Sequence, residues 1–471
     1  MSSLRPATIA VVATLLPVAA LGQGVTLPPF ERVELENGTV LVLAEKHDVP
    51  LVGVHALIRG GAITDPQGLS GIASLLAGML EKGAGERDAP AFAEAVAAVG
   101  GELAAAGERE AITISGDFLA RDVDLMVELL ADMLIRPILD RAEMQKLRDR
   151  SINFIRAAKD SNLHALVPVY GDAFLFGDHP YGPPAFGSET SLQEIQQREL
   201  LAYYGEHVGA DRLIIAAVGD FDVAAMQEKL TAAFGAWRPA AAALPEVAAT
   251  APQPGRRVLL IDKPGATQTY FWLANVGVAI DYPQRAALDL ANTLFGGRFT
   301  SMLNTELRVN SGLTYGARSI LTRPSQPGSV AISSFTKTAT TIEAIDMAID
   351  VLSRFRESGI DPELIKSAKN YVLGQYPPKF ETASQLAEQL AELELYGLDR
   401  NHVDAYADAI AGADGETISS VIGQVFPAPA DLVFVLLGDA ELIREDISKY
   451  GPVTELPITE PRFSVPEAGA D

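Results

Sequence analysis

Val218-Gly219-Asp220 ends a short apolar run, and Leu437-Gly438-Asp439 ends a similar run near the far end of the 471-residue chain. The two stretches lie roughly 220 residues apart. Two other pairs of landmarks repeat with nearly the same spacing: Asp65 with Asp281 before a helix, and Asp140 with Asp361 at a helix start. Self-similarity at one fixed period indicates an internal repeat. We therefore predict two homologous halves of about 220 residues each.

The order of strands and helices indicates the fold class. In the first half, apolar runs predict strands over residues 112–116 and 213–218. Apolar residues at helical spacing predict helices over 123–135, 141–158 and 223–234. Because this order is neither all-β nor strictly βαβ, we predict an α+β fold. In this fold, each half has two α/β domains with a mixed sheet covered by helices.

The first 22 residues have the features of a secretory signal peptide. Arg5 provides one positive charge, residues 7–21 form an apolar run, and small residues at its end allow cleavage. A retained membrane anchor needs about 20 apolar residues, which is more than this run contains. We therefore expect a periplasmic or secreted mature protein that has no membrane span.

The remaining boundaries follow from the repeat and from composition. The chain divides into a signal peptide (1–22), an N-terminal half (23–237), a linker (238–256), a C-terminal half (257–450) and a Pro-rich tail (451–471). Alanine and proline cluster in the linker, as is typical of a connection between domains. Because prolines recur in the tail, we expect it to be loosely ordered.

Composition excludes several classes of function. A formal net charge of −24 argues against nucleic-acid binding, which requires a basic surface. The chain has no cysteine, so disulfides, thiolate zinc sites, iron–sulfur clusters and a cysteine nucleophile are excluded. Its six histidines are scattered along the chain, and we expect each to be structural or on the surface. His179, which precedes Pro180, is expected to anchor a loop, with direct substrate contact as the alternative.

The stretch Gly71-Ile72-Ala73-Ser74-Leu75-Leu76-Ala77-Gly78-Met79-Leu80-Glu81-Lys82-Gly83 resembles the zinc helix of the pitrilysin/insulinase-type metallopeptidases, the inverzincins. In that family, His-x-x-Glu-His supplies two zinc-binding histidines and a glutamate that acts as general base. Here Ser74 stands at the first histidine, Ala77 at the glutamate and Gly78 at the second histidine. The later helix of the third ligand matches residues 151–158, which contain no acid. The resemblance therefore implies a metal-free N-terminal half.

The same resemblance extends to the second half. The stretch from Glu306 to Tyr315 is similar to the family's Arg-x-x-x-Gly-Leu-x-Tyr signature, and all four fixed positions are kept: Arg308, Gly312, Leu313 and Tyr315. Residues 179–192 resemble the family's segment between its two first-half domains. The resemblance covers roughly residues 30–445. It implies two halves in a clam-shell arrangement.

Two interpretations of Arg308 and Tyr315 are open. The residues alone indicate a surface charge at a helix end and a packing residue of a strand. The resemblance implies catalytic residues instead. A tyrosine hydroxyl can donate to the oxyanion formed during peptide hydrolysis, and an arginine can hold nearby substrate carbonyls. Gly312 and Leu313 are then implied to bind the substrate.

The retained signature and the missing zinc ligands together indicate a split site. We expect the non-zinc subunit of a heterodimeric periplasmic metallopeptidase, which is inactive on its own and acts on peptides. The zinc is expected in a homologous partner subunit that carries His-x-x-Glu-His. The alternative is a catalytically inactive binding or scaffold protein, like the family members that form core subunits of a respiratory complex. A self-sufficient zinc peptidase would need ligands that this chain lacks.

Overall fold

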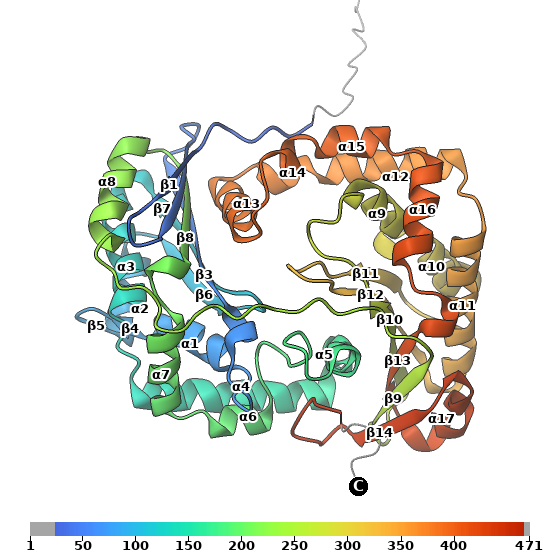
Figure 1. Ribbon diagram of the computed structural model, residues 1–471. Coiled ribbons are helices and arrows are strands. Elements are labelled where there is room, and N and C mark those ends of the chain that lie inside the picture. Colours follow the sequence, from blue (N-terminus) through green and yellow to red (C-terminus); the bar gives the residue numbers. More distant parts are fainter. Residues whose placement is uncertain (1–23, 466–471) are drawn as a thin grey trace, which may run out of the picture.

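The computed structural model describes residues 24–465, so the predicted signal peptide lies outside the described part. Each half contains one six-stranded mixed sheet with helices around it (Figure 1). This confirms the α+β class predicted from the sequence. The mixed sheet that we predicted for each half is therefore present.

The first half begins with three strands and alternates thereafter between helices and strands. Its sheet has the order β1-β2-β8-β3-β7-β6. The strands are β1 (Glu31–Glu34), β2 (Val40–Glu45), β3 (Leu51–Arg59), β6 (Glu102–Gly107), β7 (Ala111–Leu119) and β8 (Leu213–Gly219), with a small hairpin of β4 (Gly83–Ala84) and β5 (Arg87–Asp88). The helices are α1 (Ile72–Leu80), α2 (Ala89–Ala98), α3 (Val123–Ile135), α4 (Arg141–Ser161), α5 (Leu163–Phe176), α6 (Glu189–Glu194), α7 (Gln197–His207) and α8 (Val223–Phe234).

The second half has a sheet of order β11-β12-β10-β13-β9-β14. Its strands are β9 (Arg257–Asp262), β10 (Gln268–Val276), β11 (Ala317–Leu321), β12 (Ser329–Lys337), β13 (Val433–Gly438) and β14 (Val453–Pro457). Its helices are α9 (Arg285–Asn292), α10 (Met302–Asn304), α11 (Thr341–Glu357), α12 (Pro362–Gln375), α13 (Ala383–Leu395), α14 (Asn401–Asp404), α15 (Tyr406–Gly412), α16 (Gly415–Val425) and α17 (Ala440–Ile447). Two π-helical segments, η4 (Thr293–Gly297) and η5 (Thr305–Asn310), flank α10.

The two sheets repeat one topology. In the first, β3 pairs antiparallel with β7 and β8, and β8 pairs parallel with β2. In the second, β10 pairs antiparallel with β12 and β13, and β13 pairs parallel with β9. Gly219 lies opposite Glu45 in the first sheet, as Gly438 lies opposite Asp262 in the second. The glycines that mark the sequence repeat therefore occupy equivalent positions in the two sheets.

Side-chain caps fix the starts of the equivalent long helices. The Asp140 carboxylate accepts hydrogen bonds from the backbone N–H of Ala142 and Glu143 at the start of α4. Asp361 accepts from the N–H of Glu363 at the start of α12. An aspartate at this position satisfies N–H groups that have no partner within the helix. This explains why the two aspartates repeat in the sequence.

One helix of each half packs on the sheet of the other half. Helix α5 of the first half packs on β10 and β13, and α13 of the second half packs on β3 and β8, so both helices lie between the two sheets (Figure 1). Close contact depends on glycine: a Cβ on Gly171 would lie 2.7 Å from the Trp272 ring, and one on Gly53 would lie 2.5 Å from the Ser384 nitrogen. The exchange joins the two halves through their cores.

The C-terminal segment differs from our expectation. We predicted that residues 451–471 are loosely ordered, but Val453–Pro457 form β14, which pairs parallel with β9. Further along, Phe463 is buried against Tyr170 of α5, with ring centroids 5.0 Å apart. The Pro461 carbonyl accepts a hydrogen bond from the Glu189 N–H. Prolines are compatible with this path because β14 is an edge strand.

Candidate functional site

The degenerate zinc-motif positions lie on α1, where other side chains and backbone fill the space around them. Ala77 is fully buried. Strand β6 passes so close that a Cβ on Gly107 would lie 2.3 Å from the Ser74 Cα atom. A Cβ on Gly78 would lie 2.8 Å from Leu147 of α4. These small residues therefore serve helix packing.

The α1 site does not fit a zinc ion. Ser74, Ala77 and Gly78 present a hydroxyl, a methyl and a hydrogen, and Leu147 occupies the space beside Gly78. Zinc sites in proteins are built from histidine, cysteine and carboxylate ligands that converge on one point. Across residues 24–465, no three such side chains are grouped so that they could hold a metal ion.

Arg308 lies in the π-helical segment η5, partly exposed. Its guanidinium carbon is 4.6 Å from the centroid of the Phe299 ring, which is a cation–π contact. Within residues 24–465, no carboxylate lies within ion-pairing distance of Arg308. Phe299 and Val309 beside it are 64% and 65% exposed, so this cation stands on an unusually apolar part of the surface.

Tyr315 projects into solvent from the segment between η5 and β11. Its side chain is 80% exposed, and its hydroxyl has no hydrogen-bond partner within the described residues. The residue before it is fixed: the Thr314 hydroxyl is buried and accepts hydrogen bonds from the Gly316 N–H and the Ser334 hydroxyl. The interpretation of Tyr315 as a strand packing residue is therefore wrong.

Gly312 and Leu313 form the turn between Arg308 and Tyr315. Gly312 has φ of 66°, in the left-handed region that glycine adopts without strain. The Leu313 N–H donates to the Leu307 carbonyl at 2.9 Å, and its carbonyl accepts from the Thr336 hydroxyl at 2.7 Å. Both backbone groups of Leu313 thus already have a hydrogen-bond partner within the chain.

His179 anchors the segment between α8 and β9, as expected for a structural histidine. Its Nε2 lies 2.8 Å from the Ala248 carbonyl, and its Nδ1 lies 3.1 Å from the Tyr181 N–H. Since a carbonyl only accepts and an N–H only donates, Nε2 carries the proton and Nδ1 accepts. These contacts fix the loop that connects the two halves.

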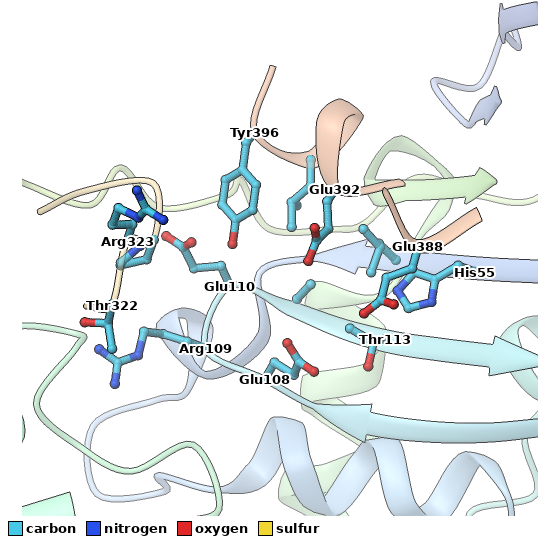
Figure 2. Close-up of a pocket in the computed structure, with 14 residues that line it drawn as sticks. His55, Glu108, Arg109, Glu110, Thr113, Thr322, Arg323, Glu388, Glu392 and Tyr396 are labelled. Atoms are coloured by element: carbon cyan, nitrogen blue, oxygen red, sulfur yellow. The ribbon is translucent and has the colours of Figure 1, made fainter. Parts of the chain in front are cut away.

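A cavity of about 290 Å³ lies where the two halves meet (Figure 2). Glu108 comes from the turn between β6 and β7, and Glu388 and Glu392 come from α13. Arg109 and Arg323 also line it, but each forms an ion pair elsewhere, with Asp172 and Asp289 respectively. Glu108, Glu388 and Glu392 therefore lie around one cavity, and none of them has an ion-pair partner within the described residues.

Crowding of these carboxylates changes their protonation. Glu392 retains contact with solvent, but desolvation in the concave site, followed by the charges of Glu388 and Glu108, raises its pKa to about 6. Desolvation and the charge of Glu388 also raise the pKa of Glu108. On the same wall, burial lowers the pKa of His55 to about 4, so its imidazole is neutral at pH 7.

A polar network beside this cavity joins the two halves. The Tyr181 hydroxyl donates to the Glu110 carboxylate at 2.6 Å, and the same carboxylate accepts from the Ser325 N–H at 3.0 Å. Burial, followed by the bond to Glu110, raises the pKa of Tyr181 to about 12, so the phenol stays protonated. Sequence reasoning missed the network because Glu110 and Ser325 are 215 residues apart. It missed the cavity because the lining residues come from both halves of the chain.

Comparison with known families matches both halves. Residues 40–185 match the insulinase family, peptidase family M16, and residues 194–372 match the family described as the peptidase M16 inactive domain. The chain belongs to peptidase family M16. The chain is a member of the inactive type, because its helix α1 lacks the zinc ligands.

Several relatives align over most of their length. The chain is 27% identical, over 78% of its length, to an uncharacterized zinc protease of Mycobacterium leprae, 82% of which is covered. It is 23% identical, over 77% of its length, to a Helicobacter pylori protein named as a non-peptidase homolog, 83% of which is covered.

The fold is shared with solved M16 structures. The crystal structure of a peptidase M16 inactive domain from Pseudomonas fluorescens superposes with a TM-score of 0.81 at 21% identity, covering 87% of this chain and 98% of that one. A protease from Helicobacter pylori gives a TM-score of 0.79 at 19% identity, with 88% and 100% covered. In residues 24–465, we find no helix that combines the length and apolarity needed to cross a membrane.

Proposed function

We propose that this chain is the non-zinc subunit of a heterodimeric periplasmic metallopeptidase. A homologous partner subunit carries the zinc-binding His-x-x-Glu-His helix, and Arg308 and Tyr315 act in trans on a peptide held there. The observation that carries this proposal is the exposure of Tyr315: 80% of its side chain is open to solvent, on a loop whose neighbouring residues are fixed by hydrogen bonds.

The chemistry of the two residues suits stabilisation of a transition state. Hydrolysis of a peptide bond places negative charge on the former carbonyl oxygen, and a preorganised hydroxyl can donate to that oxygen. Tyr315 has such a hydroxyl with no competing partner in the described residues. Arg308 stacks one face on Phe299, which leaves N–H groups at its edge for substrate carbonyls. This arrangement needs no charged group from α1.

A second candidate function is a catalytically inactive binding or scaffold protein. One observation favours it: the Helicobacter pylori relative is named as a non-peptidase homolog. In that case the exposed signature residues contact a partner protein without taking part in hydrolysis. The two candidates differ in whether the assembled complex cleaves peptides.

The test is to purify the mature chain alone and together with its homologous zinc-motif subunit. Zinc content and peptide cleavage are measured for each preparation. We expect no stoichiometric zinc and no cleavage with the chain alone, and one zinc per heterodimer with cleavage in the complex. Stoichiometric zinc and full activity in the isolated chain would refute the split site. A zinc-loaded complex that cleaves no peptide would favour the scaffold function.

A further inference from the structure

A second cavity lies behind the segment that carries Arg308. It has a volume of about 360 Å³, which is within the range of small-ligand pockets. Its walls come from η4, α10 and η5 on one side and from α11, α12 and the loop between them on the other. Five of its thirteen lining residues have large apolar side chains: Leu294, Met302, Phe355, Ile360 and Leu364. An apolar group therefore fits the interior of the cavity.

Two arginines and two acidic residues line this cavity: Arg298, Arg354, Glu306 and Asp361. Arg354 is paired with Asp350 at 2.9 Å and with Glu306 at 3.8 Å, and Asp361 accepts a backbone N–H at the start of α12. Arg298, by contrast, has no carboxylate within ion-pairing distance in residues 24–465. Arg298 is therefore the lining cation that lacks an ion-pair partner in this part of the chain.

Arg298 also holds an unused hydrogen-bond donor. Its Nη1 donates to the Ser367 hydroxyl at 3.0 Å, which fixes the guanidinium against α12. Its Nε is shielded from solvent and has no hydrogen-bond partner within the described residues. A bound carboxylate would give the guanidinium the charged partner that it lacks there.

The cavity adjoins the proposed peptide-binding surface. Arg298 is next to Phe299 in the chain, and Phe299 carries the stacked Arg308. Thr305 and Glu306, which line the cavity, lie in the same π-helical segment as Arg308. A peptide that contacts Arg308 can thus place a neighbouring residue in the cavity.

We propose that this cavity binds the carboxyl-terminal residue of a peptide with a large apolar side chain. The side chain enters the apolar interior, and the terminal carboxylate pairs with Arg298. Only the choice of a peptide as the source of this carboxylate rests on the proposed function. The pairing of an apolar group with a carboxylate follows from the cavity itself.

The test is calorimetric titration of the full mature chain alone, without partner or zinc, so that binding is separated from hydrolysis. The probe is a blocked tripeptide that ends in phenylalanine with a free carboxylate, compared with its C-terminal amide. We expect the amide to bind at least about tenfold more weakly, because a charge-assisted hydrogen bond contributes about 1.5–3 kcal/mol. Arg298→Gln should weaken binding of the acid by a similar factor, with Arg150→Gln on α4 as the control.

A second variant keeps the test decisive if Arg298→Gln does not fold. Leu364 is 46% exposed at the cavity, so Leu364→Gln places little strain on the fold. This variant should weaken the binding of a probe that ends in phenylalanine but not of one that ends in alanine.

Equal binding of acid and amide, or unchanged binding in both variants, would overturn the proposal. If 3-phenylpropionate binds as tightly as the tripeptide, the ligand is a small carboxylate, and the peptide assignment is wrong. Tyr315→Phe should not alter this binding, so failure here leaves the catalytic proposal standing.

Discussion

Backbone conformation at Gly312 positions the residues around it. With φ of 66°, this glycine turns the chain so that Arg308 on one side and Tyr315 on the other both reach the surface. No atom lies within 4 Å of the place where a Cβ would be, so glycine is favoured here by the backbone conformation and not by a lack of space. Residues other than glycine pay about 1–2 kcal/mol for the left-handed conformation.

Gly312→Ala should therefore lower the free energy of unfolding by about 1–2 kcal/mol. Urea denaturation followed by circular dichroism measures the change. The matched control is Gly374→Ala within α12, where there is also open space. At a right-handed helical position alanine is preferred over glycine, so the control should not be destabilised. A stabilised Gly312→Ala would show that the turn is not held in this conformation.

Glu392 makes stability depend on pH. Its carboxyl has a pKa of about 6 in the folded protein against 4.5 as the ordinary value, so the folded state keeps the proton at higher pH. The contribution of Glu392 to the free energy of unfolding is therefore fully present below pH 4.5 and is lost as the pH rises through 6. Glu392→Gln cannot ionise, so it should stabilise the protein above pH 6 and have little effect below pH 4.5.

Thermal unfolding at a series of pH values measures this difference. Glu228→Gln on α8 is the control, because Glu228 is exposed and has no ion pair within the described residues. A Glu392→Gln variant whose Tm shift is the same at pH 4 and pH 8 would contradict the crowding of carboxylates at the junction of the halves.

Helices that have a clear apolar spacing in the sequence have bounds close to the predicted ones. Helices α3 (Val123–Ile135) and α8 (Val223–Phe234) have the predicted bounds, because their apolar spacing matches the helical repeat. The partners of α5 and α13 could not be predicted, since an apolar helix face does not specify which sheet it covers. The order of the C-terminal segment could not be predicted for the same reason, because Phe463 packs on Tyr170, which is far away in the sequence.

The C-terminal segment should contribute measurably to stability. Phe463 is 1% exposed and packs on Tyr170 and Phe186. Phe463→Ala should lower the free energy of unfolding by about 3 kcal/mol, the lower end for buried phenylalanines. Urea denaturation tests this against Phe154→Ala, whose side chain is 71% exposed on α4. Equal effects of the two variants would mean that the tail does not pack on the first half in solution.

At the scale of the whole molecule, the exchange of α5 and α13 makes the halves depend on each other. Leu386 and Leu390 of α13 are buried, while Gly171 of α5 packs against Trp272. Separating the halves would expose these surfaces, at a cost of about 1.5–3 kcal/mol for each large apolar side chain. A rigid chain of this kind can present Arg308 and Tyr315 in a fixed position.

Cleavage at a protease site inserted into the linker tests this dependence. After cutting, we expect the two halves to remain associated through gel filtration. Once separated in urea, neither half should refold alone, whereas the mixture should recover the circular dichroism spectrum of the intact chain. Cooperative unfolding of one isolated half would contradict the dependence.

The proposed role of Tyr315 is to act on a peptide at a partner's zinc site. The most direct measurement is the rate of peptide cleavage by the heterodimer with Tyr315→Phe, which removes only the hydroxyl. We expect kcat to fall by about 10²–10³, as for loss of one oxyanion donor, with zinc content and assembly unchanged. Tyr371→Phe, at an exposed tyrosine of α12, should leave kcat as it is. An assembled Tyr315→Phe heterodimer that retains the full rate would contradict this role of Tyr315.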